Sequence, residues 1–207
     1  MKTIITIARQ YGSGGREIGQ KLAKELDIPF YDKELIALSA KENGLDEKMF
    51  EKKDERASSS LLYSLMIGNY TFGSHVSSNN DIPINDMLFL IQTDIIKKLA
   101  KEGPCVIVGR CADYVLRDES DIFNIFIHTD KLNRMDRVMH EYDVAPEKAA
   151  DYLVKKDKQR ANYYNFYTNK KWGDLENYHL TLDSAATNIN GAVELIKSAV
   201  AMKESIH

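Results

Sequence analysis

A glycine-rich turn near the amino terminus constrains the fold of this chain more than any other feature. The turn spans residues 9–17 (RQYGSGGRE), follows an apolar run over residues 3–8 and precedes a helical pattern over residues 18–26. Glycines allow backbone N–H groups to converge on an anion, and the N-terminus of the next helix adds a partial positive charge. The order of strand, glycine-rich turn and helix therefore predicts a phosphate-binding loop.

The loop departs from the common nucleotide-binding (Walker) pattern at the positions that carry its chemistry. Gly15 stands where the lysine is expected, Arg16 follows one position later, and Glu17 occupies the place of the hydroxyl residue. Arg16 is either the replacement phosphate cation or a solvated residue, and Arg9, which begins the loop, is its rival. Glu17 is either a ligand of Mg²⁺ or a carboxylate that complements the helix dipole. Gly15→Lys is expected to restore whatever the loop lacks.

The composition of the chain limits the classes of function. Its 207 residues, 43% hydrophobic and 29% charged, predict one compact domain with a small appendage. A net charge of −3 argues against a general nucleic-acid-binding protein. Two cysteines make neither a disulfide framework nor a common zinc site, which favours a reducing cytoplasm. No segment approaches the ~20 apolar residues of a membrane span.

Short apolar runs alternate with helical patterns along the chain. Strands are predicted over residues 3–8, 28–31, 105–109, 122–128 and 179–183. Four of these runs are mostly apolar throughout, as in strands that are buried on both faces of a parallel sheet. The alternation predicts an α/β sandwich with helices on both faces.

Two polar segments break this alternation. Residues 42–85 mix charges with a serine run and a Gly/Ser/Asn-rich stretch, which is typical of an insertion or a mobile flap. Residues 131–174 are expected to form a helix, a turn near residues 144–146 and a long helix.

Polar residues follow the predicted strands at their carboxyl ends, where open α/β sheets bind ligands. They are Arg9 and the glycine loop after the first strand, Asp32 after the second, Arg110 and Asp113 after the third, and Arg134 and Arg137 after the fourth. Arginines and carboxylates from four strand ends predict a site for a polyanionic ligand with a cation or ribose partner.

The chain resembles nucleoside monophosphate kinases, and most closely the divergent cytidylate kinase-like family. The resemblance rests on residues 12–16 (GSGGR), 109–113 (GRCAD) and 122–137, and covers most of the chain outside residues 42–85. It implies a three-layer α/β/α sandwich with a five-stranded parallel sheet, a nucleotide- or acceptor-binding insertion over residues 42–85 and a lid over residues 131–174. It also implies transfer of a phosphoryl group from ATP, with Mg²⁺, to a CMP-like nucleoside monophosphate or a related small metabolite.

The same resemblance implies roles for individual residues. The ATP phosphates would be bound by Arg9, Gly12, Ser13, Gly14, Gly15, Arg16 and Glu17. Charge on the transferring group would be neutralised by Arg16, Arg134, Arg137 and Arg160. The acceptor would be bound by Asp32, Arg110, Asp113, Asp157 and Arg160.

Simpler roles are open for several of these residues. Asp32 suits the N-cap of a following helix, and Asp113 suits the cap of the next turn. Asp157 and Arg160 have the spacing of an i,i+3 surface ion pair. Arg110 could also form an ordinary surface ion pair.

Two other functions compete with the kinase. A non-catalytic nucleotide-binding regulatory protein is suggested by the missing lysine. A dinucleotide (NAD) oxidoreductase is suggested by Gly12, Gly14 and Asp32, but Glu17 occupies the third glycine position of that fingerprint.

Overall fold

A computed structural model describes residues 1–33 and 84–206 of the chain. The chain divides into two compact units, one made of Met1–Lys33 with Ile96–His207 and the other of Glu34–Ile95. The first unit contains the sheet and every predicted site residue. The insertion predicted over residues 42–85, up to residue 83, and the helix predicted after Asp32 lie outside the described residues.

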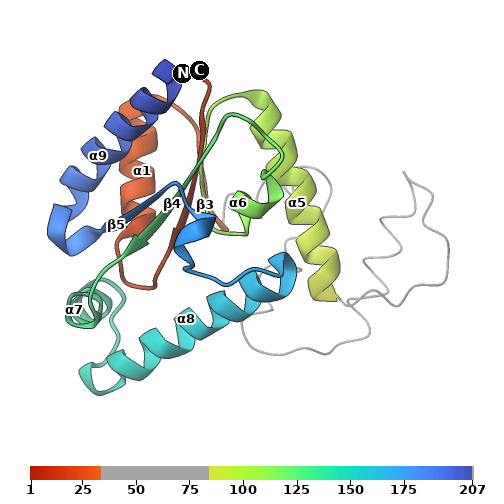
Figure 1. Cartoon of the computed structure of the whole chain (residues 1–207). Helices are drawn as coiled ribbons and strands as arrows, with labels where there is room; N and C mark the ends of the chain where they lie inside the picture. The colour runs from red at the N-terminus through yellow and green to blue at the C-terminus, as the bar shows by residue number, and fades with distance from the viewer. Residues whose placement is uncertain (34–83, 207) are drawn as a thin grey trace. The chain divides into compact units, whose positions relative to one another are not determined.

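The sheet of the first unit has five strands, which are all parallel. Its order is β2 (Phe30–Tyr31), β3 (Val106–Val108), β1 (Ile4–Arg9), β4 (Ile122–His128) and β5 (Leu180–Asp183). The five carboxyl ends therefore meet at one edge, with β1 in the centre (Figure 1). The predicted five-stranded parallel sandwich is confirmed.

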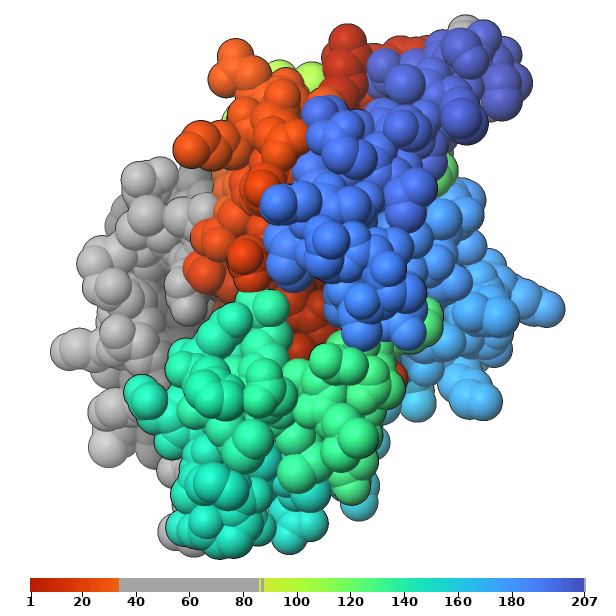
Figure 2. All heavy atoms as spheres, turned by 90° about the vertical axis from the view of Figure 1, so that its left-hand side faces the viewer, coloured from red at the N-terminus to blue at the C-terminus, as the bar shows by residue number. Residues whose placement is uncertain are grey.

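Helices cover both faces of this sheet. On one face α1 (Gly15–Leu26) and α9 (Ser184–Ile206) pack against each other, as Figure 2 shows. The remaining elements are α5 (Ile84–Glu102), α6 (Ala112–Val115), α7 (Lys131–Glu141), α8 (Pro146–Thr168) and the short 3-10 helix η1 (Leu175–Asn177). The two helices predicted within residues 131–174 are α7 and α8. Among the described residues, no helix has the length and apolar character to cross a membrane.

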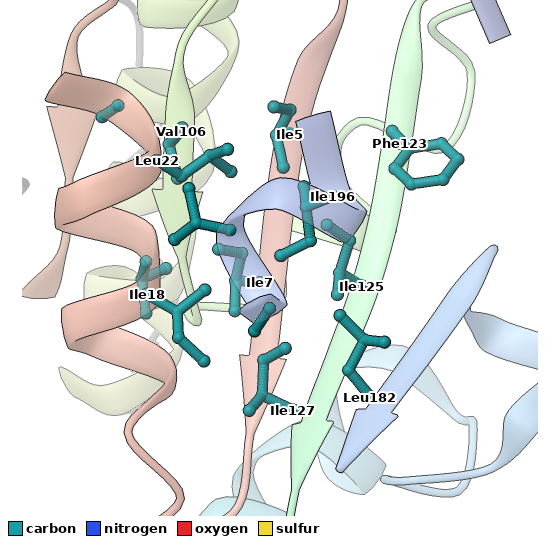
Figure 3. Close-up of a cluster of buried hydrophobic side chains, with 14 of the residues drawn as sticks. Ile5, Ile7, Ile18, Leu22, Val106, Phe123, Ile125, Ile127, Leu182 and Ile196 are labelled. Carbon is teal, nitrogen blue, oxygen red and sulfur yellow. The ribbon is translucent and has the colours of Figure 1, made fainter. Parts of the chain in front are cut away.

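The core under α1 and α9 explains why these segments become strands and helices. Alternate residues of the two central strands, Ile5 and Ile7 of β1 and Ile125 and Ile127 of β4, are fully buried (Figure 3). They meet apolar residues that recur every three to four positions along α1 and α9, namely Ile18, Leu22, Val193 and Ile196. Burial of each such side chain contributes about 1.5–3 kcal/mol, so this core fixes where the carboxyl ends of β1 and β4 lie.

Candidate active site

The glycine loop joins β1 to α1 at the carboxyl edge of the sheet. Gly12 and Gly14 have φ angles of 76° and 74°, which side-chain-bearing residues rarely adopt. A Cβ atom on Gly12 would lie 2.9 Å from the backbone oxygen of Arg134. A Cβ atom on Gly14 would lie 2.7 Å from Cδ1 of Ile189. The loop therefore requires glycine both for its backbone shape and for its close packing.

Gly15, the first residue of α1, lies directly against Arg9. A Cβ atom on Gly15 would be 2.7 Å from Cβ of Arg9 and 3.3 Å from Cβ of Ile127. A lysine at this position has no room while Arg9 keeps its side chain. This packing argues against the expectation that Gly15→Lys would restore the loop, because the space is already filled by Arg9, six positions earlier.

The Arg9 side chain runs from the end of β1 towards the end of β3. A Cβ atom on Gly109 would collide with its Nη1 atom. Burial, followed by the charges of Arg160 and Arg110, holds the pKa of Arg9 well below its ordinary value. The charge of Asp32 acts in the opposite direction, but Asp32 Oδ2 accepts a hydrogen bond of 2.7 Å from Nε of Arg16. Arg9 is thus a partly buried cation near two other cations, Arg160 and Arg110, and one carboxylate, Asp32.

Arg110 lies in an unusual turn after β3. Gly109, Arg110 and Cys111 have consecutive φ angles of 81°, 58° and 56°. A side-chain-bearing residue in this region costs about 1–3 kcal/mol and is found most often at functional sites. The turn places the guanidinium of Arg110 5.8 Å from the centroid of the Tyr163 ring on α8. Arg110 thus lies near Arg9, as the prediction of a shared site at the strand ends requires.

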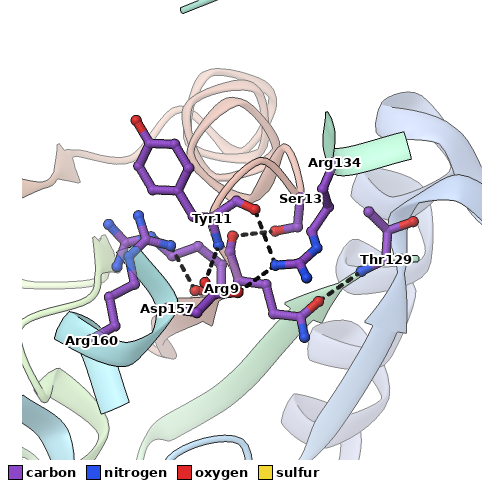
Figure 4. A network of polar contacts seen from close by, with 8 residues as sticks. Arg9, Tyr11, Ser13, Thr129, Arg134, Asp157 and Arg160 are labelled. Atoms are coloured by element: carbon purple, nitrogen blue, oxygen red, sulfur yellow. Dashed lines mark hydrogen bonds and ion pairs between the residues drawn. The ribbon is translucent and has the colours of Figure 1, made fainter. Parts of the chain in front are cut away.

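Arg160 reaches the loop from the middle of α8. Its Nη1 atom donates a hydrogen bond of 2.8 Å to the backbone oxygen of Arg9, and its Cζ atom lies 4.9 Å from the centroid of the Tyr11 ring (Figure 4). Burial lowers the pKa of Arg160; the charge of Asp157 opposes this shift, and the charge of Arg110 adds to it. Arg9, Arg110 and Arg160, from three separate elements, form what we call the arginine cluster.

Asp157 connects α8 to the glycine loop. Its Oδ1 atom accepts a hydrogen bond of 2.7 Å from the backbone N–H of Tyr11, and its Oδ2 atom contacts Nη1 of Arg134 (Figure 4). Its hydrogen bonds therefore go to the loop and to α7, and the surface pair with Arg160 does not form. Arg134 is held between this carboxylate and the backbone oxygen of Tyr11, 3.4 Å from its Nη1 atom.

Arg137 ties α7 to the first turn of α1. Its Nη2 atom contacts Glu17 and lies 2.8 Å from Oε2 of Glu141. The Nε atoms of Arg134 and Arg137 are buried without a hydrogen-bond partner within the described residues. Glu17 therefore lies between the positive end of the α1 dipole and a guanidinium, which matches its simpler predicted role.

Asp113 follows the Arg110 turn but is directed into the protein. Its Oδ2 atom accepts a hydrogen bond of 2.7 Å from the hydroxyl of Tyr164 on α8, and its side chain is buried. Burial raises the pKa of the Asp113 carboxyl. A contact with an acceptor, as the sequence predicted, would require this bond to break, so Asp113 is better placed to hold α6 to α8.

The raised pKa of Asp113 predicts how stability depends on pH. Above about pH 4 the unfolded chain releases a proton that the folded protein keeps, so stability falls as the pH rises towards the raised pKa. Asp113→Asn keeps an acceptor for Tyr164 and is expected to weaken this fall, as measured by urea unfolding between pH 4 and 7. Asp118→Asn, at a side chain that is 83% exposed, is the control. Parallel pH profiles for wild type and Asp113→Asn would refute the prediction.

Two tyrosines of the site were missed by sequence reasoning. Tyr11 supplies the ring under Arg160 and the N–H bound by Asp157, and its ring also contacts Tyr142 and Tyr152. Tyr164 is the partner of Asp113. The position of Tyr11 inside the loop was a usable signal, whereas the pairing of Tyr164 with a residue 51 positions away left none.

Comparisons with known proteins identify the family of this chain. The sequence profile of the cytidylate kinase-like family matches residues 4–186. A cytidylate kinase from Methanococcus aeolicus is 26% identical over 108 residues, which are 51% of this chain and 61% of that protein. The chain thus matches about three fifths of the length of that relative.

Solved structures share the fold. An uncharacterized protein from Eubacterium ventriosum superposes with a TM-score of 0.73 at 28% identity, over 97% of this chain and 99% of that one. A shikimate kinase from Bacteroides thetaiotaomicron superposes with a TM-score of 0.53 at 11% identity, over the same shares of the two chains. The second likeness concerns the fold alone. The family profile covers almost the whole chain, and the protein therefore belongs to the cytidylate kinase-like family.

Proposed function

We propose that the protein is an ATP-dependent phosphotransferase. The γ-phosphoryl group of ATP would pass to a nucleoside monophosphate of the CMP or dCMP kind, or to a related small metabolite. The observation that carries this proposal is the arginine cluster beside the glycine loop, at the edge of the sheet where α/β proteins bind ligands. Membership of the cytidylate kinase-like family supports the same class of reaction.

The residues of the loop fit the phosphates of a nucleotide. Gly12 and Gly14 give the loop its left-handed backbone and its close packing against Arg134 and Ile189, and α1 begins at Gly15 with its N-terminus at the loop. Backbone N–H groups and the helix dipole both favour an anion there. Ser13 is buried and its hydroxyl donates to the backbone oxygen of Gln10 (2.9 Å), so it shapes the turn from inside.

Magnesium fits this site as an ion carried by the nucleotide. Within the described residues, no group of three or more His, Cys, Asp or Glu side chains could hold a metal ion. Mg²⁺ is commonly bound by substrate phosphates and only one or two carboxylates. Asp157, Asp32 and Glu17 are carboxylates at or beside the loop, and each already has a partner within the protein. When bound, the ion would offset the negative charge of the phosphates.

The chain itself would contribute positioning and charge neutralisation. The arginine cluster would bind oxygens of the transferring group and of the acceptor phosphate, and no covalent intermediate with the protein is required. Arg16 extends towards Asp32, so we assign this pair to the acceptor side of the loop. Arg134 and Arg137 would neutralise charge only after exchanging their carboxylate partners for phosphate.

Those carboxylate partners favour a second candidate function. Asp157 accepts a hydrogen bond from the N–H of Tyr11, and Glu17 forms an ion pair with Arg137. Groups in and beside the loop that could bind phosphate are therefore already paired. A nucleotide-binding regulatory protein without turnover could tolerate this arrangement. It would bind nucleotide without transferring a phosphoryl group.

An acceptor screen separates the two functions. ADP release is measured with ATP and Mg²⁺ in the presence of CMP, dCMP, UMP or AMP, and each nucleotide is titrated by calorimetry. We expect Mg²⁺-dependent ADP release above the acceptor-free rate, greatest with a cytidine nucleotide. Binding of ATP with no turnover on any acceptor would favour the regulatory protein. Absence of nucleotide binding would reject both functions.

A further inference from the structure

The glycine loop carries a basic residue at its first position, whereas the common phosphate loop carries one at its last. The common phosphate-loop pattern, G-x-x-x-x-G-K, begins with glycine and ends with lysine. The same seven positions here begin with Arg9 and end with Gly15, while Gly14 keeps its place. Glycine and the basic residue have therefore exchanged positions.

The packing of the loop explains why such an exchange has to be reciprocal. A Cβ atom on Gly15 would lie 2.7 Å from Cβ and 3.0 Å from Cγ of Arg9. Real side chains do not approach this closely, so only one of these two positions can carry a long side chain. Arg9 fills the space through which a side chain from position 15 would otherwise pass.

We propose that Arg9 is the phosphate-binding cation of this loop and that position 15 is glycine to make room for it. The ligand is the polyphosphate chain of a nucleotide, and to that extent the proposal rests on the function proposed above. Arg9 would take the role of the absent lysine from a site at the end of β1.

The electrostatics of Arg9 support this assignment. Its side chain is partly buried near Arg110 and Arg160, whose charges disfavour its protonated form, while the charge of Asp32 acts in the opposite direction. Three neighbouring, partly desolvated cations repel one another, and an anion that joins them relieves this repulsion. A polyphosphate bound at the loop would supply that anion.

Arg16, the rival cation, is placed differently. Its side chain is 48% exposed, and its Nε atom donates a hydrogen bond to Asp32. Because water and a carboxylate already stabilise its charge, removal of Arg16 should affect an anion at the loop less than removal of Arg9.

The first test compares two matched substitutions by calorimetry, with inorganic tripolyphosphate and with ATP as separate ligands. Arg9→Met is expected to weaken the binding of both ligands by at least about 10-fold, the effect of losing a charge-assisted hydrogen bond. Arg16→Met is expected to weaken it less than about 3-fold. Loss of ATP binding alone would place Arg9 at the nucleoside instead and would overturn the proposal.

The second test transfers the basic residue from position 9 to position 15, where the common phosphate loop has its lysine. Gly15→Lys alone is expected to abolish tripolyphosphate binding or folding, because its Cβ atom collides with Arg9. The double variant Arg9→Gly/Gly15→Lys removes that collision and is expected to recover binding to within about 5-fold of wild type. The 3.3 Å approach to Ile127 remains in both variants and is thus matched. A double variant that folds but binds no better than Arg9→Met would count against the exchange.

Thermal unfolding supplies a readout that does not depend on turnover. Without ligand, Arg9→Met should unfold at least about 2 °C above wild type, because the repulsion of Arg9 by Arg110 and Arg160 is gone. With saturating tripolyphosphate, wild type should gain stability and Arg9→Met should gain little. Equal ligand-induced shifts would refute the role of Arg9.

The role of Arg9 and the proposed function can fail separately. If wild type binds tripolyphosphate through Arg9 but releases no ADP, only the proposed function fails. If wild type binds neither tripolyphosphate nor ATP, both proposals fail.

Discussion

Arg160→Met is expected to lower kcat/KM for phosphoryl transfer by about 10²–10³-fold, the effect of removing one preorganised donor from a developing charge. Arg160 holds the backbone oxygen of Arg9, stacks on the ring of Tyr11 and completes the arginine cluster. Its loss removes both a positive charge and the support of the loop. The measurement is steady-state ADP release with the best acceptor of the screen.

Lys156→Met is the matched control for this prediction. Lys156 lies one turn earlier on α8 and also stacks on a tyrosine, with Nζ 5.3 Å from the centroid of the Tyr152 ring. It lies outside the arginine cluster, so the same loss of charge should change kcat/KM less than about 3-fold. Arg160→Lys should recover part of the activity. Unaltered turnover in a folded Arg160→Met protein would exclude Arg160 from the reaction.

Gly12→Ala is expected to destabilise the protein by about 2–5 kcal/mol and to abolish nucleotide binding. The left-handed backbone at Gly12 contributes about 1–2 kcal/mol of this effect. The collision of the new Cβ atom with the backbone oxygen of Arg134 contributes about 1–3 kcal/mol more. The free energy of unfolding in urea and calorimetry with ATP measure the two effects.

Gly173→Ala separates the two causes. Gly173 has a φ angle of 75°, almost equal to that of Gly12, but the nearest atom to its Cβ position is Cζ of Phe126 at an ordinary 3.4 Å. This substitution should cost only about 1–2 kcal/mol and leave nucleotide binding intact. Equal destabilisation by the two substitutions would show that packing against α7 does not constrain the loop.

The fold was predictable from sequence because its signals are local. Apolar runs that are buried on both faces, such as β4, differ plainly from the three- to four-residue periodicity of α9. The strand ends then followed, and with them the positions of Arg9, Arg110 and Arg134. Because the carboxyl ends of parallel strands lie at one edge, these residues can be predicted to share that edge without knowing their side-chain contacts.

The partners of these residues were not predictable, because they depend on packing between distant segments. Asp157 has the spacing of a partner for Arg160, yet it bonds to Tyr11, 146 positions away. Asp113 lies beside Arg110 in sequence, yet it faces Tyr164. The left-handed conformation of Arg110 and Cys111 could not be predicted from residue type, since neither is glycine or asparagine.

The central position of β1 also bears on how the chain folds. β1 comes before both of its neighbours in the chain, β3 and β4, with Ile5 opposite Val106 on one side and Phe123 on the other. During synthesis β1 therefore remains an apolar, unpaired strand until β3 has been made. Such long-range pairing slows folding and exposes strand edges to aggregation, so we expect unpaired β1 to be most prone to aggregation before β3 and β4 are available.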